Sequence, residues 1–213
     1  MPARSSAGLG LLGGGGQAME TAEFAAPSAV VFAAVESRFI THDSRFVLVD
    51  IDTSDPDLLS TPVNVSVGAP ALRRRLVNAW QGSSYRSIVS SDAYVSVSAQ
   101  VGEGVTVSAG AVVSSAVRLG DHSHVNVGAS LSHEVVLGEF SSVAPGARLT
   151  GGVRVHDGVF VGAGAVVYGE VELKEGCVIG AGAVLKCETV PFGVYVGVPA
   201  RLVGVRKGWL DAV

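Results

Sequence analysis

The stretch "VGEGVTVSAGAVVSSAVRLGDHSHVNVGASL", residues 101–131, places an aliphatic residue at every sixth position. The same period extends in both directions without an insertion. Its 17 positions are Val89, Val95, Val101, Val107, Val113, Leu119, Val125, Leu131, Leu137, Val143, Leu149, Val155, Val161, Val167, Leu173, Ile179 and Leu185. Because valine, leucine and isoleucine make up only 59 of 213 residues, 17 successive matches exclude a chance pattern.

The residues four places after these positions are small or valine. They are Ala93, Ala99, Val105, Ala111, Val117, Ser123, Ala129, Val135, Ser141, Ala147, Val153, Val159, Ala165, Val171, Cys177 and Ala183. A six-residue period fits neither the 3.6-residue turn of a helix nor the simple alternation of a long strand. It fits short strands joined by tight corners, with one aliphatic side chain per strand filling a narrow interior. We therefore predict a mainly β fold, with a parallel β-solenoid and its tail over residues 85–213.

Composition and charge exclude several classes of protein. The 213 residues include 15 basic and 19 acidic side chains, a formal net charge of −4, so we expect neither nucleic acid nor membrane as a partner. Hydrophobic residues make up 48% of the chain, but none of their runs approaches the ~20 residues that span a bilayer. The Gly-rich opening is a poor signal-peptide core, which favours a cytoplasmic protein. Cys177 and Cys187 show no CxxC spacing, and we expect reduced, structural thiols.

The amino-terminal part of the chain follows a different pattern. "GLGLLGGGGQAME" (8–20) is typical of a strand, a Gly-rich turn and a helix, and "FVLVDID" (46–52) of a second strand. "VNVSVG" (63–68) and "APALRRRLVNAW" (69–80) follow as a third strand and a helix with a proline in its first turn. This order predicts a small, Rossmann-like α/β domain over residues 1–84.

Two features of this predicted domain suit a ligand. Gly14 and Gly15 belong to the Gly-rich turn, although such turns also occur merely to close a tight connection. Asp50 and Asp52 end the second predicted strand, where they could meet ribose hydroxyls as in dinucleotide folds. Equally, these two carboxylates could cap the turn into "TSDPD". Residue patterns alone leave both alternatives open.

The repeat contains one adjacent His–Glu pair, in "LSHEVVLGEF" (131–140), where His133 precedes Glu134. A neutral imidazole has a suitable pKa for general-base catalysis near pH 7, and a nearby carboxylate can orient the ring. Neighbours on a flat strand point to opposite faces, but a corner of the coil would relax that restriction. The pair is therefore a candidate catalytic centre.

The chain resembles one family, the left-handed β-helix (hexapeptide-repeat) sugar acetyltransferases. This family includes sialic acid O-acetyltransferases and enzymes that acetylate nucleotide-linked 4-amino sugars. The most specific matches are "VSVGAPALRRRL" (65–76), "HVNVGASLSHEVVLGEFSSVAPGARLTGGVRV" (124–155) and "VGVPAR" (196–201). The resemblance covers about residues 8–204 and implies triangular coils of three hexads each, acetyl-CoA as cosubstrate and a homotrimer.

A coil of three hexads places Gly151 and Gly152 directly over His133 and Glu134. This stacking leaves a notch beside the imidazole, where a pantetheine arm could lie and a main-chain N–H could meet an oxyanion. The resemblance implies that His133 is the catalytic base, with Glu134 as its acidic neighbour. It also implies a backbone contact from Gly151 to acetyl-CoA, and that Asn126 helps to place the acceptor.

The remaining site residues come from the residue patterns of the predicted α/β domain and from the resemblance. Those on the acceptor side are Gly14, Gly15, Gln17, Asp50, Asp52, Gly68 and Asn126. Those on the acetyl-CoA side are Ser142, Gly151, Gly152, Lys174, Lys186 and Gly197, although solvent exposure explains the two lysines nearly as well. Gln17 departs from the family, which usually has a histidine in the sugar-nucleotide site. Ser142 stands where several members have a histidine that touches the thioester carbonyl.

We therefore expect direct acetyl transfer from acetyl-CoA to the amino group of a nucleotide-linked amino sugar of the 4-amino-4,6-dideoxy type. An alternative acceptor is a sugar hydroxyl, such as that of sialic acid. An alternative of another class is a noncatalytic trimeric β-helix scaffold. We expect no metal site, because the two-histidine spacing of zinc-dependent β-helix enzymes is absent. The active sites are expected between subunits.

Overall fold

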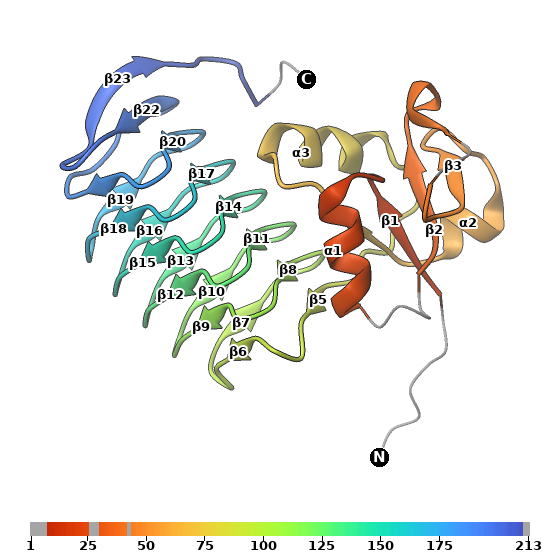
Figure 1. Cartoon of the computed structure of the whole chain (residues 1–213), viewed down its shortest axis with the longest axis horizontal. Coiled ribbons are helices and arrows are strands. Elements are labelled where there is room, and N and C mark those ends of the chain that lie inside the picture. Colours follow the sequence, from red (N-terminus) through yellow and green to blue (C-terminus); the bar gives the residue numbers. More distant parts are fainter. Residues whose placement is uncertain (1–7, 26–29, 42–43, 211–213) are drawn as a thin grey trace.

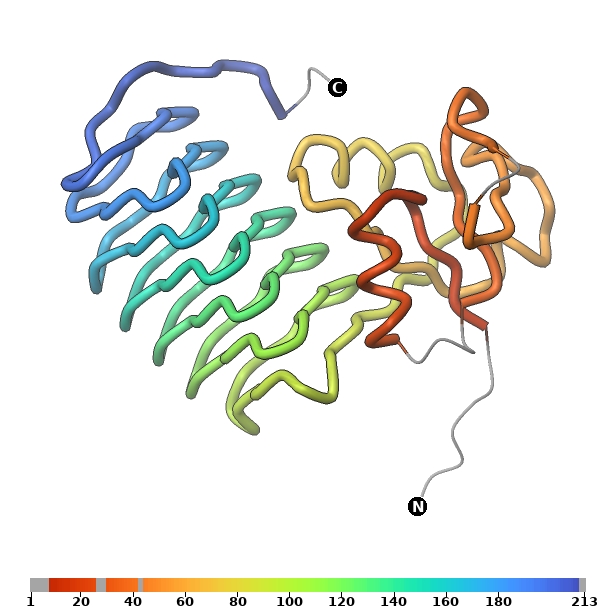
Figure 2. Tube along the Cα trace, in the orientation of Figure 1, coloured from red at the N-terminus to blue at the C-terminus, as the bar shows by residue number. Residues whose placement is uncertain are grey.

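The computed structural model describes residues 8–25, 30–41 and 44–210. A small α/β unit stands beside a column of stacked coils (Figure 1), and the trace in Figure 2 shows how regular those coils are. The predicted fold class is confirmed: a left-handed parallel β-helix follows a small α/β unit. Within the described ranges, no helix has both the length and the apolar character needed to cross a membrane.

The amino-terminal unit is a four-stranded parallel sheet with helices packed against it. Its strand order is β3-β2-β1-β4, and every neighbouring pair is parallel. This order is that of one half of a doubly wound nucleotide-binding sheet, with the switch point beside β1. The elements are β1 (Leu9–Leu12), α1 (Gly16–Phe24), β2 (Val30–Val35), the 3-10 helix η2 (Ser37–Phe39), β3 (Leu48–Asp50), α2 (Pro56–Ser60), β4 (Val63–Val65) and α3 (Pro70–Ala79).

The structure corrects one part of the predicted α/β unit. The segment 46–52 supplies β3 and is the third strand, whereas the second strand is β2, which the sequence pattern did not reveal. The reason is that a strand buried in a parallel sheet is a continuous apolar run, here "VVFAAV", with no alternation to detect. The short helix α2 was also missed. The helix predicted over 69–80 is confirmed as α3.

The β-helix consists of two-residue strands that stack into three parallel sheets. Paired strands are three hexads apart in the sequence, so that Arg118 pairs with Gln100 in one neighbouring coil and Val136 in the other. The predicted coil of three hexads is thus confirmed. The strands are β5 (Ile88–Val89), β6 (Tyr94–Val95), β7 (Gln100–Val101), β8 (Thr106–Val107), β9 (Val112–Val113), β10 (Arg118–Leu119), β11 (His124–Val125), β12 (Ser130–Leu131), β13 (Val136–Leu137), β14 (Ser142–Val143), β15 (Arg148–Leu149), β16 (Arg154–Val155), β17 (Phe160–Val161), β18 (Val166–Val167), β19 (Glu172–Leu173), β20 (Val178–Ile179) and β21 (Val184–Leu185).

The interior of the coils holds one aliphatic side chain from each strand. In the six-residue series, every side chain from Val107 to Leu185 is at most 4% exposed. The first coil is more open, and Val89 stays exposed. The other end is covered by β22 (Gly193–Val196), which extends the sheet beyond β20, and by β23 (Arg201–Val205), antiparallel to β22. The series is therefore the core of this unit.

Buried hydrogen bonds join the two units, and α1 lies between the amino-terminal sheet and the coils (Figure 1). Arg73 of α3 donates to the carbonyl oxygens of His122 and Phe140, at 2.6 Å each. Nδ2 of Asn64, on β4, donates to the carbonyl of Gly104 at 3.3 Å. The division into domains 1–84 and 85–213 stays a prediction.

Candidate active site

His133 and Glu134 lie at the corner between β12 and β13. Nδ1 of His133 is 3.0 Å from Oε2 of Glu134. Glu134 has a φ of +62°, so the backbone turns here and the two neighbouring side chains can meet. The side chains are 65% and 71% exposed, respectively. Because Nδ1 faces the carboxylate, Nε2 of His133 is the ring atom that can take a proton from a substrate.

Gly151 and Gly152 occupy the same corner one coil further along. The N–H of Gly152 donates to the carbonyl of His133 at 3.0 Å, which confirms the predicted stacking. A β-carbon added to Gly151 would lie 2.5 Å from both Cε1 and Nε2 of His133, so the imidazole fills the space that a side chain would need. Since the Gly152 N–H is already used, the N–H of Gly151 is the candidate donor to an oxyanion.

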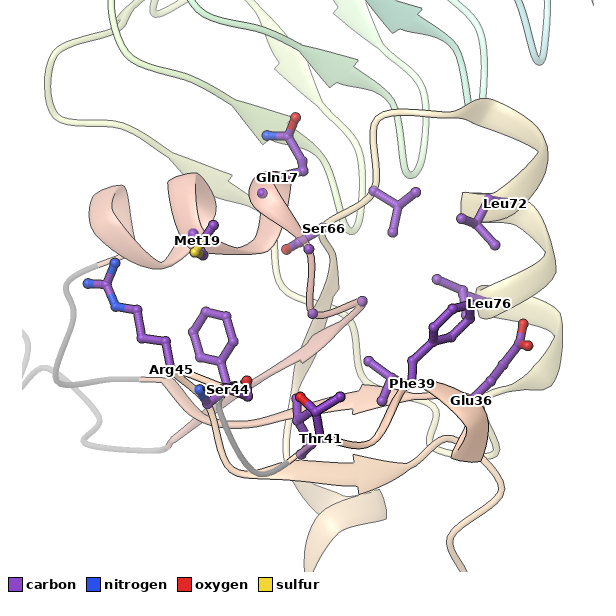
Figure 3. Close-up of a pocket in the computed structure, with 18 of the residues that line it drawn as sticks. Gln17, Met19, Glu36, Phe39, Thr41, Ser44, Arg45, Ser66, Leu72 and Leu76 are labelled. Carbon is purple, nitrogen blue, oxygen red and sulfur yellow. Dashed lines mark hydrogen bonds between the residues drawn. The ribbon is translucent and has the colours of Figure 1, made fainter.

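A pocket of about 890 Å³ opens at the carboxyl ends of β1, β2 and β4 (Figure 3). The Gly-rich loop, the start of α1, the segment after β2 and one side of α3 form its walls. Its apolar lining includes Met19, Val35, Phe39, Phe46, Leu48, Val67, Leu72 and Leu76. In doubly wound sheets, this crevice at the switch point is where nucleotides bind.

Four of the predicted acceptor residues, Gly14, Gly15, Gln17 and Gly68, line this pocket. Gln17 lies on the side that faces the coils of the β-helix (Figure 3). There Nδ2 of Asn126 donates to Oε1 of Gln17 at 3.4 Å. A β-carbon at Gly15 would meet no atom within 4 Å, so there is open space in front of α1. Backbone N–H groups at such a helix start favour an anion.

Asp50 and Asp52 are not among the residues that line the pocket. One oxygen of Asp50 accepts a hydrogen bond from the Ser37 hydroxyl, and the other accepts the N–H of Asp52 at 3.0 Å. These two hydrogen bonds, that of Ser37 first, hold the pKa of Asp50 below its usual value. The structure therefore favours the turn-capping alternative and corrects the acceptor role. The physical reason is that β3 is the edge strand, with β2 between it and β1.

The sequence analysis did not identify Glu36, Arg38 and Arg45, which line the pocket. Glu36 follows β2 and pairs with Arg75 of α3 and, at 2.8 Å, with Arg38. The carboxylate at the end of the second strand is the one that meets ribose hydroxyls in dinucleotide folds. Glu36 was not recognised as the carboxylate at the end of the second strand, because β2 itself was not predicted. Asp50 was taken for that carboxylate instead.

Ser142 lies on β14, only 3% exposed, beneath the loop between β4 and α3. Its hydroxyl donates to the carbonyl of Gly68 at 2.8 Å and accepts a hydrogen bond from Nη2 of Arg73, also at 2.8 Å. The single hydroxyl proton is thus committed to Gly68, and the geometry does not support the expected contact with a thioester. The sequence could not show this, because it does not reveal that this face of the β-helix is covered.

Lys174 and Lys186 have equivalent places in their hexads but lie at different corners of the coils. Nζ of Lys174 is 2.6 Å from Oε2 of Glu172, and this contact and then that of His156 lower the pKa of Glu172 to about 2. The structure therefore places Lys174 in an ion pair rather than in a groove. Neither the His156–Glu172 pair nor any other group in the described ranges assembles three metal-ligating side chains.

Lys186 lies at the corner that carries His133, close to the carboxyl end of the β-helix. The strand pairing from β12 through β15 and β18 to β21 places Cys187 at the position of His133, three coils further along. A hollow of about 490 Å³ lies here, lined by Tyr168, Val184, Lys186, Cys187, Val198, Pro199, Ala200 and Arg201. Gly197 adjoins it, with a φ of +95°. The hollow and the imidazole thus share one edge of the β-helix.

The two halves of the candidate site occupy different corners of the β-helix. Asn126, at the edge of the pocket, follows β11, whereas His133 follows the next strand, β12. One full side of the triangular coil therefore separates the pocket edge from the imidazole of the same chain.

Comparisons with known proteins agree with this fold. Residues 152–187 match the family model "Bacterial transferase hexapeptide (six repeats)". The acetyltransferase domain of PglB from Neisseria gonorrhoeae, solved with acetyl coenzyme A, is 27% identical with a TM-score of 0.82, over 93% of this chain and 100% of that one. PerB from Caulobacter crescentus, solved with CoA and GDP-perosamine, is 28% identical with a TM-score of 0.79, over 92% and 97%.

WeeI from Acinetobacter baumannii has a TM-score of 0.81 over 92% of this chain and 99% of that one, at 20% identity, and shows the shared fold. A search of the curated proteins found no match. The repeat, the fold and these matches indicate an acyltransferase whose fold is a left-handed β-helix of hexapeptide repeats. The similarity covers nearly the whole chain, and one of the matching structures is a perosamine N-acetyltransferase from Caulobacter crescentus.

Proposed function

We propose that this protein transfers the acetyl group of acetyl-CoA to the amino group of a nucleotide-linked amino sugar. The observation that carries the proposal is the His133–Glu134 pair above Gly151, in a chain similar to PglB and PerB. An imidazole with an oriented Nδ1 and a free Nε2 suits proton removal from a nucleophile. A scaffold would need no such arrangement.

The pocket of the amino-terminal unit supports a nucleotide as the handle of the acceptor. The open space before α1 and the guanidinium groups of Arg38 and Arg75 suit a diphosphate. Glu36, between these two arginines, lies where a carboxylate can meet ribose hydroxyls. The apolar wall with Phe39 offers a surface for the base. A nucleotide sugar bound here would direct its sugar toward Gln17 and Asn126.

The hollow near Lys186 and Arg201 supports the binding of CoA along the edge that carries His133. Two cationic side chains at its rim suit the phosphates of the nucleotide end of CoA. The pantetheine arm would then extend from this hollow along the same corner of the coils toward the imidazole of His133. PglB and PerB were solved with acetyl coenzyme A and CoA, respectively.

The chemistry proposed is a direct transfer between the two substrates. The lone pair of the amino group attacks the thioester carbonyl carbon, and the N–H proton passes to Nε2 of His133. Glu134, at Nδ1, stabilises the imidazolium that forms. The N–H of Gly151 would stabilise the oxyanion. The C–S bond then breaks, and the proton on Nε2 passes to the CoA thiolate, which restores the neutral base.

We also propose a homotrimer in which the sites lie between subunits. Because one side of the coil separates the pocket edge from the imidazole of the same chain, the pocket of one subunit would face His133 of a neighbour. A cyclic arrangement repeats such a heterologous contact until the ring closes. Each trimer would then hold three equivalent sites, each built from two chains.

The test is the release of free thiol from acetyl-CoA with UDP-, GDP- and dTDP-linked 4-amino sugars and with free sialic acid. We expect turnover with one of the nucleotide-linked amines and a gain of one acetyl group in its mass. The His133→Ala variant should lose at least ~100-fold in turnover, as expected for removal of a general base. Turnover that survives in this variant would remove His133 from the mechanism. Turnover with sialic acid alone would replace the amine by a hydroxyl.

A further inference from the structure

Ser142 and Arg73 form a buried connection between the β-helix and the wall of the nucleotide pocket. The Ser142 hydroxyl is bonded on both sides, to the carbonyl of Gly68 and to Nη2 of Arg73, at 2.8 Å each. Both side chains are almost completely buried, at 3% and 1% exposure. Water therefore cannot replace either bond without a change in the packing around them.

The guanidinium of Arg73 holds several segments together at this point. Nη1 donates to the carbonyl of Val67, next to Gly68, while Nε donates to His122 and Nη2 to Phe140, at 2.6 Å each. Its partners in these bonds are carbonyl oxygens, and burial lowers its pKa to about 9. Each bond to this buried cation is costly to break, because an unpaired charge in the interior has no other compensation.

Gly68 and Val67 are part of the pocket itself. Both line it, as does Gln17, whose Oε1 would lie 3.8 Å from a β-carbon added to Gly68. Gln17 is in turn held by Asn126, whose N–H donates to the carbonyl of Val143, next to Ser142. The mouth of the pocket is thus fixed to two adjacent coils of the β-helix.

We propose that Ser142 is a positioning residue for the acceptor and not a contact to acetyl-CoA. By holding the Gly68 carbonyl, it fixes the loop between β4 and α3 and so the shape of the pocket that receives the nucleotide. This assignment rests on one part of the proposed function, namely that the pocket binds a nucleotide. A positioning role predicts that loss of the Ser142 hydroxyl weakens binding of the acceptor and leaves binding of acetyl-CoA unchanged. A role at the thioester predicts the reverse.

The test compares Ser142→Ala with the wild type in steady-state kinetics and in direct binding of UDP, GDP, dTDP and CoA by calorimetry. We expect the KM for the acceptor and the Kd for the bound nucleotide to rise about three- to ten-fold, the range for loss of the neutral bond to the Gly68 carbonyl. The lost bond from Arg73 adds little to this, because Nη2 of Arg73 keeps the carbonyls of Phe140 and Ser141. The KM for acetyl-CoA, the Kd for CoA and kcat should stay within about two-fold, because the variant leaves the edge with His133 unchanged.

Thr106→Val is the matched control. Thr106 lies on the same sheet, two coils from Ser142, and its hydroxyl donates to Oδ1 of Asn64 at 3.1 Å. That bond also joins the two units and is buried, but neither residue lines the pocket. We expect Thr106→Val to lower thermal stability about as much as Ser142→Ala, with nucleotide affinity unchanged.

Three results would overturn the assignment. A rise in the acetyl-CoA constants of Ser142→Ala, with the acceptor constants unchanged, would restore the role at the thioester. Equal losses of nucleotide affinity in Thr106→Val would mean that any loosening between the units has this effect. A wild type that binds none of the three nucleotides would also overturn it. By contrast, nucleotide binding that depends on Ser142 but leads to no acetyl transfer would contradict the proposed function alone.

Discussion

At the scale of single residues, His133 and Glu134 show which features of a site can be predicted from the sequence. The sequence singled out the pair, but neighbours in a strand point apart, so their contact could not be inferred from the residue types. The left-handed φ of +62° at Glu134 provides the turn, and no glycine marks it in the sequence. The sequence thus predicted a role for the two side chains, but it did not predict the backbone turn that brings them into contact.

Replacement of Glu134 by glutamine should lower kcat by about ten-fold, less than the ~100-fold expected for the base itself. The amide keeps the size of the side chain but cannot stabilise an imidazolium by charge. Glu170 is the matched control, since it lies two coils further along the same corner and also has a φ of +62°. Glu170→Gln should leave kcat unchanged. Equal effects of the two substitutions on steady-state kinetics would contradict the role of Glu134.

His124 predicts how stability depends on pH. It is buried beside Ser108, and burial, then the charge of Arg73, lowers its pKa from 6.5 to about 3. The unfolded chain therefore takes up this proton first as the pH falls. The neutral, buried ring of His124 makes its full contribution to the free energy of unfolding above pH 6.5, and this contribution is lost as the pH falls toward 3. His122 is shifted in the same direction, chiefly by burial.

We expect the free energy of unfolding to fall between pH 6.5 and 5 by up to about 1.4 kcal/mol per pH unit from His124. The measurement is urea unfolding at pH 7, 6 and 5 for the wild type and for His124→Asn, which cannot take up a proton. The variant should show a flatter dependence on pH. Parallel curves for the wild type and His124→Asn would contradict the burial of a neutral ring.

At the scale of elements, the six-residue period predicted the core of the β-helix because each coil repeats the same packing requirement. The parallel sheet was harder to predict, because β2 carries no alternation of apolar and polar residues. Without β2, the candidate carboxylate for ribose hydroxyls was sought at Asp50 rather than at Glu36. The place of Ser142 was unpredictable for a related reason. Which side of the coil is covered depends on contacts between elements far apart in the chain.

Gly15 tests the start of α1 as the site of the diphosphate. Its backbone is extended, with a φ of −86°, and a side chain there would meet open space, so Gly15→Asp should fold. Aspartate is also a favoured residue at this position of a helix, and we expect the melting temperature to be unchanged or slightly higher. Its carboxylate should repel a diphosphate and weaken nucleotide binding by at least about ten-fold.

Calorimetric titration with UDP, GDP and dTDP measures this effect, and Gly15→Asn is the matched control of nearly equal size without the charge. The asparagine variant should keep most of the affinity. Equal affinity in the wild type and Gly15→Asp would show that no phosphate lies at this helix, which would move the acceptor to another site.

At the scale of the whole molecule, the pocket and the imidazole are each complete within one chain but lie at different corners of the coil. The sequence predicted residues on both halves, and the resemblance implied that subunits share a site. The geometric reason for a shared site is that the pocket edge follows β11 and the imidazole follows β12, at different corners of the triangular coil. The central claim is therefore that His133 of one subunit acts on an acceptor held by another.

Mixing two variants that are impaired in different halves of the site tests this claim most directly, at an acceptor concentration well below the KM of Gly15→Asp. His133→Ala keeps its pocket and Gly15→Asp keeps its base, so trimers that contain both can assemble intact sites between unlike subunits. When the two are co-expressed in equal amounts, an intact neighbour pair occurs at about a quarter of the sites. We predict recovery of roughly a quarter of the wild-type rate of thiol release. Mixed trimers that are no more active than their parents would contradict the shared site and place the whole reaction within one chain.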